Sequence, residues 1–449
     1  MAGLEEWIER QHRYAAQAVL NSVSRVDLVK PRPGFGHIIR ASKGSVVASC
    51  VLADWNPEPD YFFHWFRDSA LIIDSLRLLH AAGDLGPEAL EHVRDFVHFS
   101  RSLQKLDGRA LVESALGWRA RVAEDFVRFL RQDAELALVR GESVVAETRV
   151  NPDGTLDISS WTRPQHDGAP LRALALLRWA RGASLDASFD AELSALVMSD
   201  LAFTLRAWRE PAYDMWEEEK GLHYHTLCCS AAALSEGADW LDSRGDRDPA
   251  HAYRAESGAI FKALDEFWSS AEGFYRSRIL PTGGRSPKDL DIAVIFAAIH
   301  ALTRGRSHSV HDPRLHATLQ KLESLFDERY EINRRRGAGT RPAMGRYDGD
   351  VYFSGGAYYF STLGAAEFCY RAAAGDSAPS AWIERGDGYL ATVRAFTPAT
   401  GEMSEQFDQR TGEQTSARHL GWSYAAFISC IAARREVTRA SVGSSGPTV

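Results

Sequence analysis

Amphipathic and nearly apolar segments alternate along the chain, and a loop leads from each amphipathic segment into the next apolar one. The amphipathic segments cover residues 4–22, 87–106, 187–208, 251–268, 313–328 and 381–396. The apolar segments cover residues 69–82, 171–180, 225–234, 292–302, 356–374 and 420–433. A helix that is apolar nearly all round is buried on all sides, whereas an amphipathic helix lies at the surface. Six of each predict two concentric rings, an all-α (α/α)6 barrel of six inner and six outer helices.

The rest of the chain refines this prediction. An open α-solenoid is the alternative, but the spacing of the segments varies too much and no repeated motif recurs. One extra helix is expected over residues 118–138, and a strand pattern of useful length occurs only around residues 38–51. We expect a single domain over residues 1–437 and a flexible tail over residues 438–449.

The predicted barrel indicates where the charged and aromatic residues of the loops should lie. All six loops that lead from an outer helix into an inner helix open at the same end of such a barrel. Charged and aromatic residues that stand out in the sequence lie in these loops, so we expect them to converge at one mouth.

The most unusual loop reads YDMWEEEKG, residues 213–221. It gathers an indole and four acids: Asp214, Trp216, Glu217, Glu218 and Glu219. Crowded like charges and an adjacent indole disfavour the ionised form of a carboxyl group, which keeps a proton available for donation. A solvated acidic turn is the alternative interpretation of this run.

Four other loops carry candidate residues. The loop before residue 69 holds Tyr61, Trp65, Arg67 and Asp68, and the loop before residue 171 holds Trp161, Arg163, Gln165, His166 and Asp167. Asp68 and Ser69 could equally form a helix N-cap, and the second loop could be a turn with an N-cap. The loop before residue 356 contributes Arg346, Asp350, Tyr352 and Tyr358. The loop before residue 420 contributes Glu405, Asp408, Glu413 and Trp422. Arginine and carboxylate side chains can each form paired hydrogen bonds with neighbouring hydroxyl groups.

Composition and charge limit the partners. Apolar residues make up 45% and charged residues 25%, as in soluble globular proteins. The net charge of -8, without a basic block, argues against nucleic acid and anionic membranes. The five cysteines show no metal-ligand spacing, so we expect no metal and no cofactor. No export signal or membrane-spanning run is apparent, which favours the cytoplasm. Two carboxyl groups that flank a pocket fit glycoside hydrolysis.

Five segments in the same order resemble the glucoamylases of glycoside hydrolase family 15. They read YFFHWFRDSALIIDSL, SWTRPQHDGAPLRALAL, YDMWEEEKG, GRYDGDVY and SEQFDQRTGEQTSARHLGWSYAA. The resemblance covers nearly the whole chain from residue 4 to about residue 434. It implies an (α/α)6 barrel that releases β-glucose from non-reducing ends of α-1,4-glucans with inversion at the anomeric carbon, as a glucan 1,4-alpha-glucosidase.

Residue roles follow from the same resemblance. Glu217 matches the general acid and Glu405 the general base. The positions that match substrate-binding residues or pocket aromatics, or that stand where the family binds sugar, are Tyr61, Trp65, Arg67, Asp68, Trp161, Asp214, Trp216, Glu218, Arg346, Tyr352, Tyr358 and Trp422. The sequence departs from the family at Tyr358, where a tryptophan is usual, and at His166, where an arginine is usual.

These departures leave alternatives open. The same site could act on isomaltose, dextran or trehalose, or use phosphate in place of water. A glucan-binding domain without catalysis would have lost one of the two glutamates, and this chain retains both. We expect an oligosaccharide or polysaccharide as the partner; the sequence makes no prediction about oligomeric state.

Overall fold

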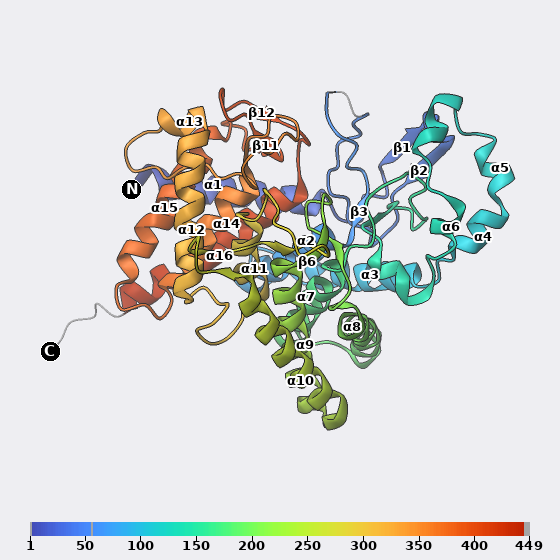
Figure 1. Cartoon of the computed structure of the whole chain (residues 1–449), viewed down its shortest axis with the longest axis horizontal. Helices are drawn as coiled ribbons and strands as arrows, with labels where there is room; N and C mark the ends of the chain where they lie inside the picture. The colour runs from blue at the N-terminus through green and yellow to red at the C-terminus, as the bar shows by residue number, and fades with distance from the viewer. Residues whose placement is uncertain (1, 55–56, 444–449) are drawn as a thin grey trace. The chain divides into compact units, whose positions relative to one another are not determined.

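The computed structural model describes residues 2–54 and 57–443, and most of these residues are helical (Figure 1). The chain forms two compact units, named here by their candidate glutamates. The Glu217 unit comprises Leu20–Gly221 and Ala233–Glu256 within the described residues. The Glu405 unit comprises the described parts of Met1–Val19, Leu222–Ala232 and Ser257–Val449.

All twelve expected helices form. The amphipathic segments become α1 (Ala2–Leu20), α3 (Glu88–Leu103), α8 (Ala187–Ala207), α10 (Arg247–Leu264), α12 (Pro313–Arg329) and α15 (Pro379–Phe396). The apolar segments become α2 (Phe66–Ala82), α7 (Gly168–Gly182), α9 (Tyr224–Arg244), α11 (Ala293–Ala301), α14 (Tyr359–Ala373) and α16 (Gly421–Gly443). Nearly every residue of α11 and α14 is buried, whereas α12 buries a single face. As expected, the apolar segments form helices that are buried nearly all round, and the amphipathic segment forms a helix that is buried on one face.

Helix α16 extends into the first part of the tail expected over residues 438–449. The helix continues to Gly443, so it includes residues 438–443. Residues 444–449 lie outside the described residues.

The expected helix over residues 118–138 is wrong. This stretch instead follows α4 (Gly108–Glu113) with α5 (Ala115–Arg119), η2 (Glu124–Phe129) and α6 (Asp133–Leu136), which Figure 1 shows as separate short turns. Between η2 and α6 the backbone is extended and pairs with a distant loop: the Arg131 N–H donates to the Ile158 carbonyl at 2.9 Å. Pairing across 27 residues of sequence therefore overrides the local helical pattern.

In the Glu217 unit, α7 contacts both α2 and α8. The Trp179 indole of α7 donates to the Ile73 carbonyl of α2 at 3.0 Å. Arg172 of α7 forms a buried ion pair with Asp200 of α8 at 2.7 Å. These bonds fix α7 against α2 and α8; the candidate residues lie at or before the N-terminal ends of α2 and α7.

Short antiparallel strands complete this unit. β1 (Val29–Arg32) pairs with β2 (His37–Arg40) across η1 (Pro33–Phe35), and β3 (His64–Trp65) pairs with β4 (Arg149–Val150). η3 (Gly141–Ala146) precedes β4, and β5 (Ala212–Tyr213) pairs with the start of β6 (Lys220–His223). The strand pattern noted around residues 38–51 is realised only at its start, in β2.

In the Glu405 unit, α14 contacts α11, α15 and α16. The end of β6 pairs with β9 (Arg278–Ile279), and β7 (Trp268–Ser269) pairs with β8 (Phe274–Tyr275). A three-stranded sheet joins β10 (Ala357–Tyr358), β11 (Gln406–Phe407) and β12 (Gln414–Thr415), with β11 in the middle. The remaining short elements are η4 (Asp265–Phe267) and α13 (Glu331–Arg334). The three-stranded sheet places Glu405, which directly precedes β11.

Candidate active site

Glu217 lies at the tip of the β5–β6 hairpin. Its φ of 67° is in the left-handed region, which residues other than glycine seldom adopt. The turn is closed by Asp214: its carbonyl accepts from the Glu217 N–H at 2.9 Å, and its carboxylate accepts from the Glu218 N–H at 2.8 Å. The buried Asp214 side chain therefore holds the backbone that presents Glu217.

The Glu217 carboxylate accepts hydrogen bonds from three separate parts of the Glu217 unit. Oε1 accepts from the Trp65 indole at 2.8 Å and from Arg67 at 3.4 Å. Oε2 accepts from the Trp161 indole. Strand β3, helix α2 and the loop before α7 each contribute one of these donors, and together they fix the orientation of the Glu217 carboxyl group. The sequence singled out these residues but gave no indication that all three would meet Glu217.

Arg67 is buried among acids. Its guanidinium lies 3.2 Å from Asp68 and 3.5 Å from Asp167, and it donates to the Gln165 side chain at 3.2 Å. Burial by itself lowers the pKa of Arg67, but the charges of Asp68, Asp167 and Glu217 outweigh it and raise that pKa. The guanidinium is therefore a permanent cation among these acids.

The pKa values of the two acids beside Arg67 are also raised, which for a carboxyl group favours the neutral form. Burial raises the pKa of Asp68, and the nearby Glu217 charge adds to this effect while Arg67 opposes it. Burial also raises the pKa of Asp167 to about 6, again opposed by Arg67 and reinforced by Glu217 and Asp68. Neither side chain caps its helix: α2 begins after Trp65, and Asp167 makes no side-chain bond to the start of α7.

Close backbone packing positions this group. A Cβ atom on Gly168 would lie 2.5 Å from the Cβ of Phe66, so only glycine allows the first turns of α7 and α2 to approach this closely. Asp167 directly precedes Gly168, and Arg67 directly follows Phe66.

The two indoles that donate to Glu217 pack against further side chains. The rings of Tyr61 and Trp65 are 5.1 Å apart, and both residues belong to the segment before α2. The buried Arg149 guanidinium lies 3.8 Å from the Trp161 ring centroid and 4.8 Å from that of Trp65. Arg149 is a residue that sequence reasoning missed, because it follows the stretch wrongly expected to be helical. Trp216 is buried in the hairpin turn.

In the Glu405 unit, Glu405 is held by the loop that precedes α16. Its N–H donates to the Ala417 carbonyl at 2.8 Å, and its Oε2 accepts from the Ser416 hydroxyl. Ser416 has a φ of 63°, again in the left-handed region. Its strained backbone directs a hydroxyl donor at the carboxylate.

Arg346 and Asp350 form a second buried pair in this unit. The Arg346 Nε and Nη2 atoms donate to the two Asp350 oxygens at 2.7 and 2.6 Å. The Tyr358 hydroxyl donates to Asp350 at 3.0 Å and accepts from the Gln406 side chain at 2.8 Å. Tyr358 is fully buried, so its hydroxyl supports the ion pair, whereas Tyr352 is only partly buried.

Trp422 belongs to the first turn of α16. Its ring stacks face to face on Phe360 of α14, with centroids 4.2 Å apart and ring planes inclined by 2°. Only 4% of Trp422 is exposed. One face of this predicted pocket aromatic is therefore occupied by the core.

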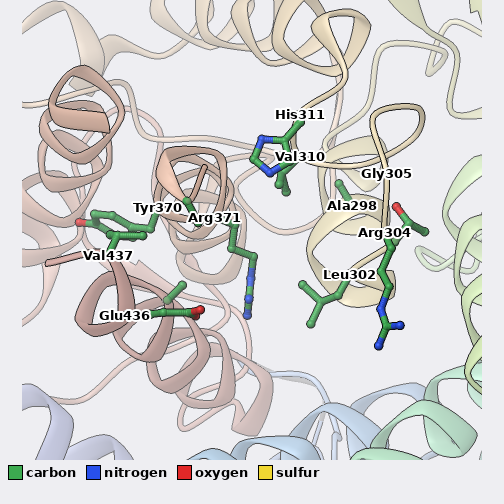
Figure 2. Close-up of a pocket in the computed structure, with 13 residues that line it drawn as sticks. Ala298, Leu302, Arg304, Gly305, Val310, His311, Tyr370, Arg371, Glu436 and Val437 are labelled. Atoms are coloured by element: carbon green, nitrogen blue, oxygen red, sulfur yellow. The ribbon is translucent and has the colours of Figure 1, made fainter. Parts of the chain in front are cut away.

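A cavity of about 370 Å³ lies elsewhere in the Glu405 unit, at the C-terminal ends of α11 and α14. Figure 2 shows the Arg371 side chain in this cavity, between Leu302 and Glu436. None of the predicted site residues lines it. Among residues 2–54 and 57–443, no cluster of three histidine, cysteine or acidic side chains could hold a metal ion.

The described chain also contains no helix that combines the length and apolar character needed to cross a bilayer.

Comparisons with known proteins place these motifs in a family. The model of "Glycosyl hydrolases family 15" matches residues 14–383 and 374–432. A probable glucoamylase of Schizosaccharomyces pombe is 27% identical over 98% of this chain and 94% of its own length. The intracellular sporulation-specific glucoamylase of Saccharomyces cerevisiae is 25% identical over 97% of this chain and 85% of its own length.

Solved structures agree on the fold. Glucoamylase from Hypocrea jecorina superimposes with a TM-score of 0.77 at 23% identity, covering 97% of this chain and 73% of that chain. Hormoconis resinae glucoamylase gives a TM-score of 0.74 at 26% identity, covering 96% and 74% of the two chains. The predicted all-α (α/α)6 barrel is confirmed by these neighbours. The chain belongs to the glycosyl hydrolases of family 15.

Proposed function

We propose that this hydrolase is an exo-acting glucan 1,4-alpha-glucosidase, with Glu217 as general acid and Glu405 as general base. The observation that carries the proposal is the environment of Glu217, whose two oxygens are held by Trp65, Arg67 and Trp161. A catalytic acid must be held in one orientation toward the bond that it protonates. The names of the relatives, which are glucoamylases, support the same activity.

The residues around Glu217 suit the non-reducing end of a glucan. Arg67 and Asp68 are proposed to bind neighbouring hydroxyls of the terminal glucose, since a guanidinium and a carboxylate each accommodate paired hydrogen bonds. Tyr61, Trp65 and Trp161 supply aromatic faces for the apolar side of the sugar ring and for the positive charge that develops at the anomeric carbon. Arg346, held by Asp350, and Glu218 are proposed to bind the next sugar.

Inversion requires a second carboxylate that activates water on the opposite face of the sugar. In inverting enzymes the two carboxyl groups lie roughly 6.5–9.5 Å apart, which leaves room for that water. We assign this role to Glu405, because the Ser416 hydroxyl donates to its Oε2 and so orients the carboxylate. Water adds to the anomeric carbon, its proton passes to Glu405, and the Glu217 proton passes to the departing oxygen.

The proposal also includes the cellular compartment of the enzyme and its organisation as one catalytic domain. None of the five cysteines forms a disulfide within the described residues, and Cys228, Cys229, Cys369 and Cys430 are buried. Buried thiols without disulfides are typical of a reducing compartment. One similar enzyme is named intracellular. We propose a cytoplasmic enzyme with one catalytic domain that acts on maltooligosaccharides or larger α-1,4-glucans.

Two substitutions test the assignment. Glu217→Gln and Glu405→Gln should each lower kcat on maltooligosaccharides by about 10²–10⁴-fold, the usual contribution of general acid–base catalysis. Exposed Glu210→Gln and Glu402→Gln are matched controls that should retain activity. Wild-type activity in either site variant would remove that residue from the mechanism.

A substrate panel defines the reaction. Glucose release from maltose should exceed release from isomaltose, dextran and trehalose, and it should not depend on phosphate. A preference for one of the other linkages, or a requirement for phosphate, would replace the α-1,4 hydrolase assignment.

A further inference from the structure

The cavity of about 370 Å³ in the Glu405 unit has the size of a ligand site, since small-molecule sites typically measure about 300–1,000 Å³. It lies at the C-terminal ends of α11 and α14, and residues 433–437 of α16 and the loop that follows α11 form further walls. Most of its lining side chains are apolar, namely Ala298, Leu302, Val310, Ala374, Ala433 and Val437. The cavity therefore offers an apolar surface to one face of a small molecule.

Helix α14 separates this cavity from the proposed catalytic residues. Tyr359, the first residue of α14, donates its backbone N–H to the Glu405 carbonyl at 3.3 Å. Arg371, which lines the cavity, belongs to the last turn of the same helix. The 12 residues between these two positions correspond to about 18 Å along the helix axis. The cavity is therefore a second site, distinct from the one that contains Glu405.

Arg371 and Glu436 present opposite charges to the cavity. The Arg371 Nε atom donates to Glu367 at 2.7 Å, and its Nη2 atom lies 2.6 Å from the same oxygen. Within residues 2–54 and 57–443, neither Nη1 of Arg371 nor the carboxylate of Glu436 has a hydrogen bond. Figure 2 shows the Arg371 guanidinium between Leu302 and Glu436. Because 18% of the Arg371 side chain is exposed and Glu436 is exposed as well, both groups are accessible to a solute.

These charges select the class of ligand. An anion would meet the Glu436 carboxylate and the C-terminal ends of α11 and α14, which carry partial negative charge. A cation would meet Arg371 and Arg304, which also lines the cavity. A purely apolar ligand would displace water from both charged groups without replacing its hydrogen bonds. A neutral molecule with several hydroxyl groups donates to Glu436, accepts from Arg371 and places its CH groups on the apolar wall.

We propose that this cavity binds a neutral polyhydroxylated molecule of about the size of one monosaccharide. Nη1 of Arg371 donates to one hydroxyl oxygen of the ligand, and the Glu436 carboxylate accepts from another hydroxyl. Leu302 and Val437 contribute to the apolar wall against which the ring of the ligand packs. The proposal goes beyond the proposed function, because none of the residues assigned to catalysis or substrate binding lines this cavity.

Methyl NMR with D-glucose as the probe tests the proposal. In protein labelled with ¹³C at leucine and valine methyl groups, glucose should shift the signals of Leu302, Val310 and Val437 along a saturable curve. Glu436→Ala removes the acceptor and should raise the dissociation constant about tenfold, as expected for one hydrogen bond to a charged group. Glu384→Ala is the matched control, because Glu384 is an exposed glutamate of α15 that does not line the cavity. It should leave the curve unchanged.

Several results would overturn the assignment. They are the absence of saturable shifts at the three cavity methyls, equal dissociation constants in the two variants, and a stronger response to glycine or inorganic phosphate than to glucose. Leu420 lies two residues before Trp422 and reports glucose at the proposed catalytic site, so a shift at Leu420 alone would also contradict the cavity assignment. The titration measures binding and not turnover, so it decides the cavity whether or not the protein hydrolyses maltose.

Discussion

The Trp161 indole donates a hydrogen bond to Oε2 of Glu217, a residue 56 positions later in the chain. Arg149 packs against the same indole ring, with its guanidinium 3.8 Å from the ring centroid. The orientation of the proposed general acid therefore depends on the loop before α7 and on a residue of β4 as well as on its own hairpin.

Trp161→Phe keeps the ring but removes the N–H donor. The general acid must carry its proton to react, so the lost bond is one to a neutral group and contributes about 0.5–1.5 kcal/mol; kcat/KM on maltose should therefore fall by roughly 2- to 13-fold. Steady-state kinetics measure the loss, and circular dichroism checks that the helices are retained. Trp118→Phe is the control, because the Trp118 indole donates to the Leu111 carbonyl instead. Equal activity in the two variants would show that the Trp161 N–H does not orient Glu217.

The raised pKa of Asp167 should make the free energy of unfolding depend on pH. Its pKa is raised to about 6, chiefly by burial, from an ordinary value of 3.8. Between pH 4 and 6 the unfolded chain loses a proton that the folded chain keeps, so the contribution of Asp167 to the free energy of unfolding falls as the pH rises. A shift of about two pKa units corresponds to about 3 kcal/mol.

Asp167→Asn has no carboxyl proton to lose. Its free energy of unfolding, relative to wild type, should therefore rise by about 3 kcal/mol between pH 4 and pH 7. Denaturant unfolding at several pH values measures this difference. Asp246→Asn, at an exposed position between α9 and α10, should show no such trend. A difference between Asp167→Asn and wild type that stays constant with pH would refute the role of Asp167.

Tyr358 supplies a prediction for the Glu405 unit. Tyr358→Phe removes a donor from the buried Asp350 and leaves the Gln406 side chain without one of its acceptors. Unsatisfied buried groups of this kind cost about 1–3 kcal/mol, so the free energy of unfolding should fall by that amount. Because Asp350 holds Arg346, KM should rise more than kcat falls. Tyr253→Phe, at another buried tyrosine, controls for loss of a phenolic hydroxyl. A fall in kcat at constant KM would contradict a supporting role in binding.

The sequence pattern was sufficient to predict the helices, because the spacing of apolar residues indicates which faces of a helix are buried. The segment 292–302 is apolar all round and becomes the buried helix α11, and the segment 313–328 has one apolar face and becomes α12. The stretch over residues 118–138 was predicted incorrectly, since the extended backbone at Arg131 pairs with residue 158. No local pattern reports such a tertiary pairing.

The candidate residues were found by residue type and by family motif, but their contacts were not. Periodicity indicates which residues are buried, and it does not indicate that Trp65 and Trp161 donate to the same carboxylate. The adjacent indole singled out in the sequence was Trp216, whereas the indoles of Trp65 and Trp161, from other segments, donate to Glu217. Likewise, Tyr358 was expected to contact substrate, and its burial behind Asp350 is a property of the folded unit.

Proton NMR of maltose hydrolysis tests the central assignment most directly, because it reports which anomer forms first. If Glu405 activates water opposite the bond that Glu217 protonates, the H1 signal of β-glucose must appear first, and α-glucose must follow only at the rate of mutarotation. Initial release of α-glucose would mean retention through a covalent intermediate, and would contradict the roles proposed for Glu217 and Glu405.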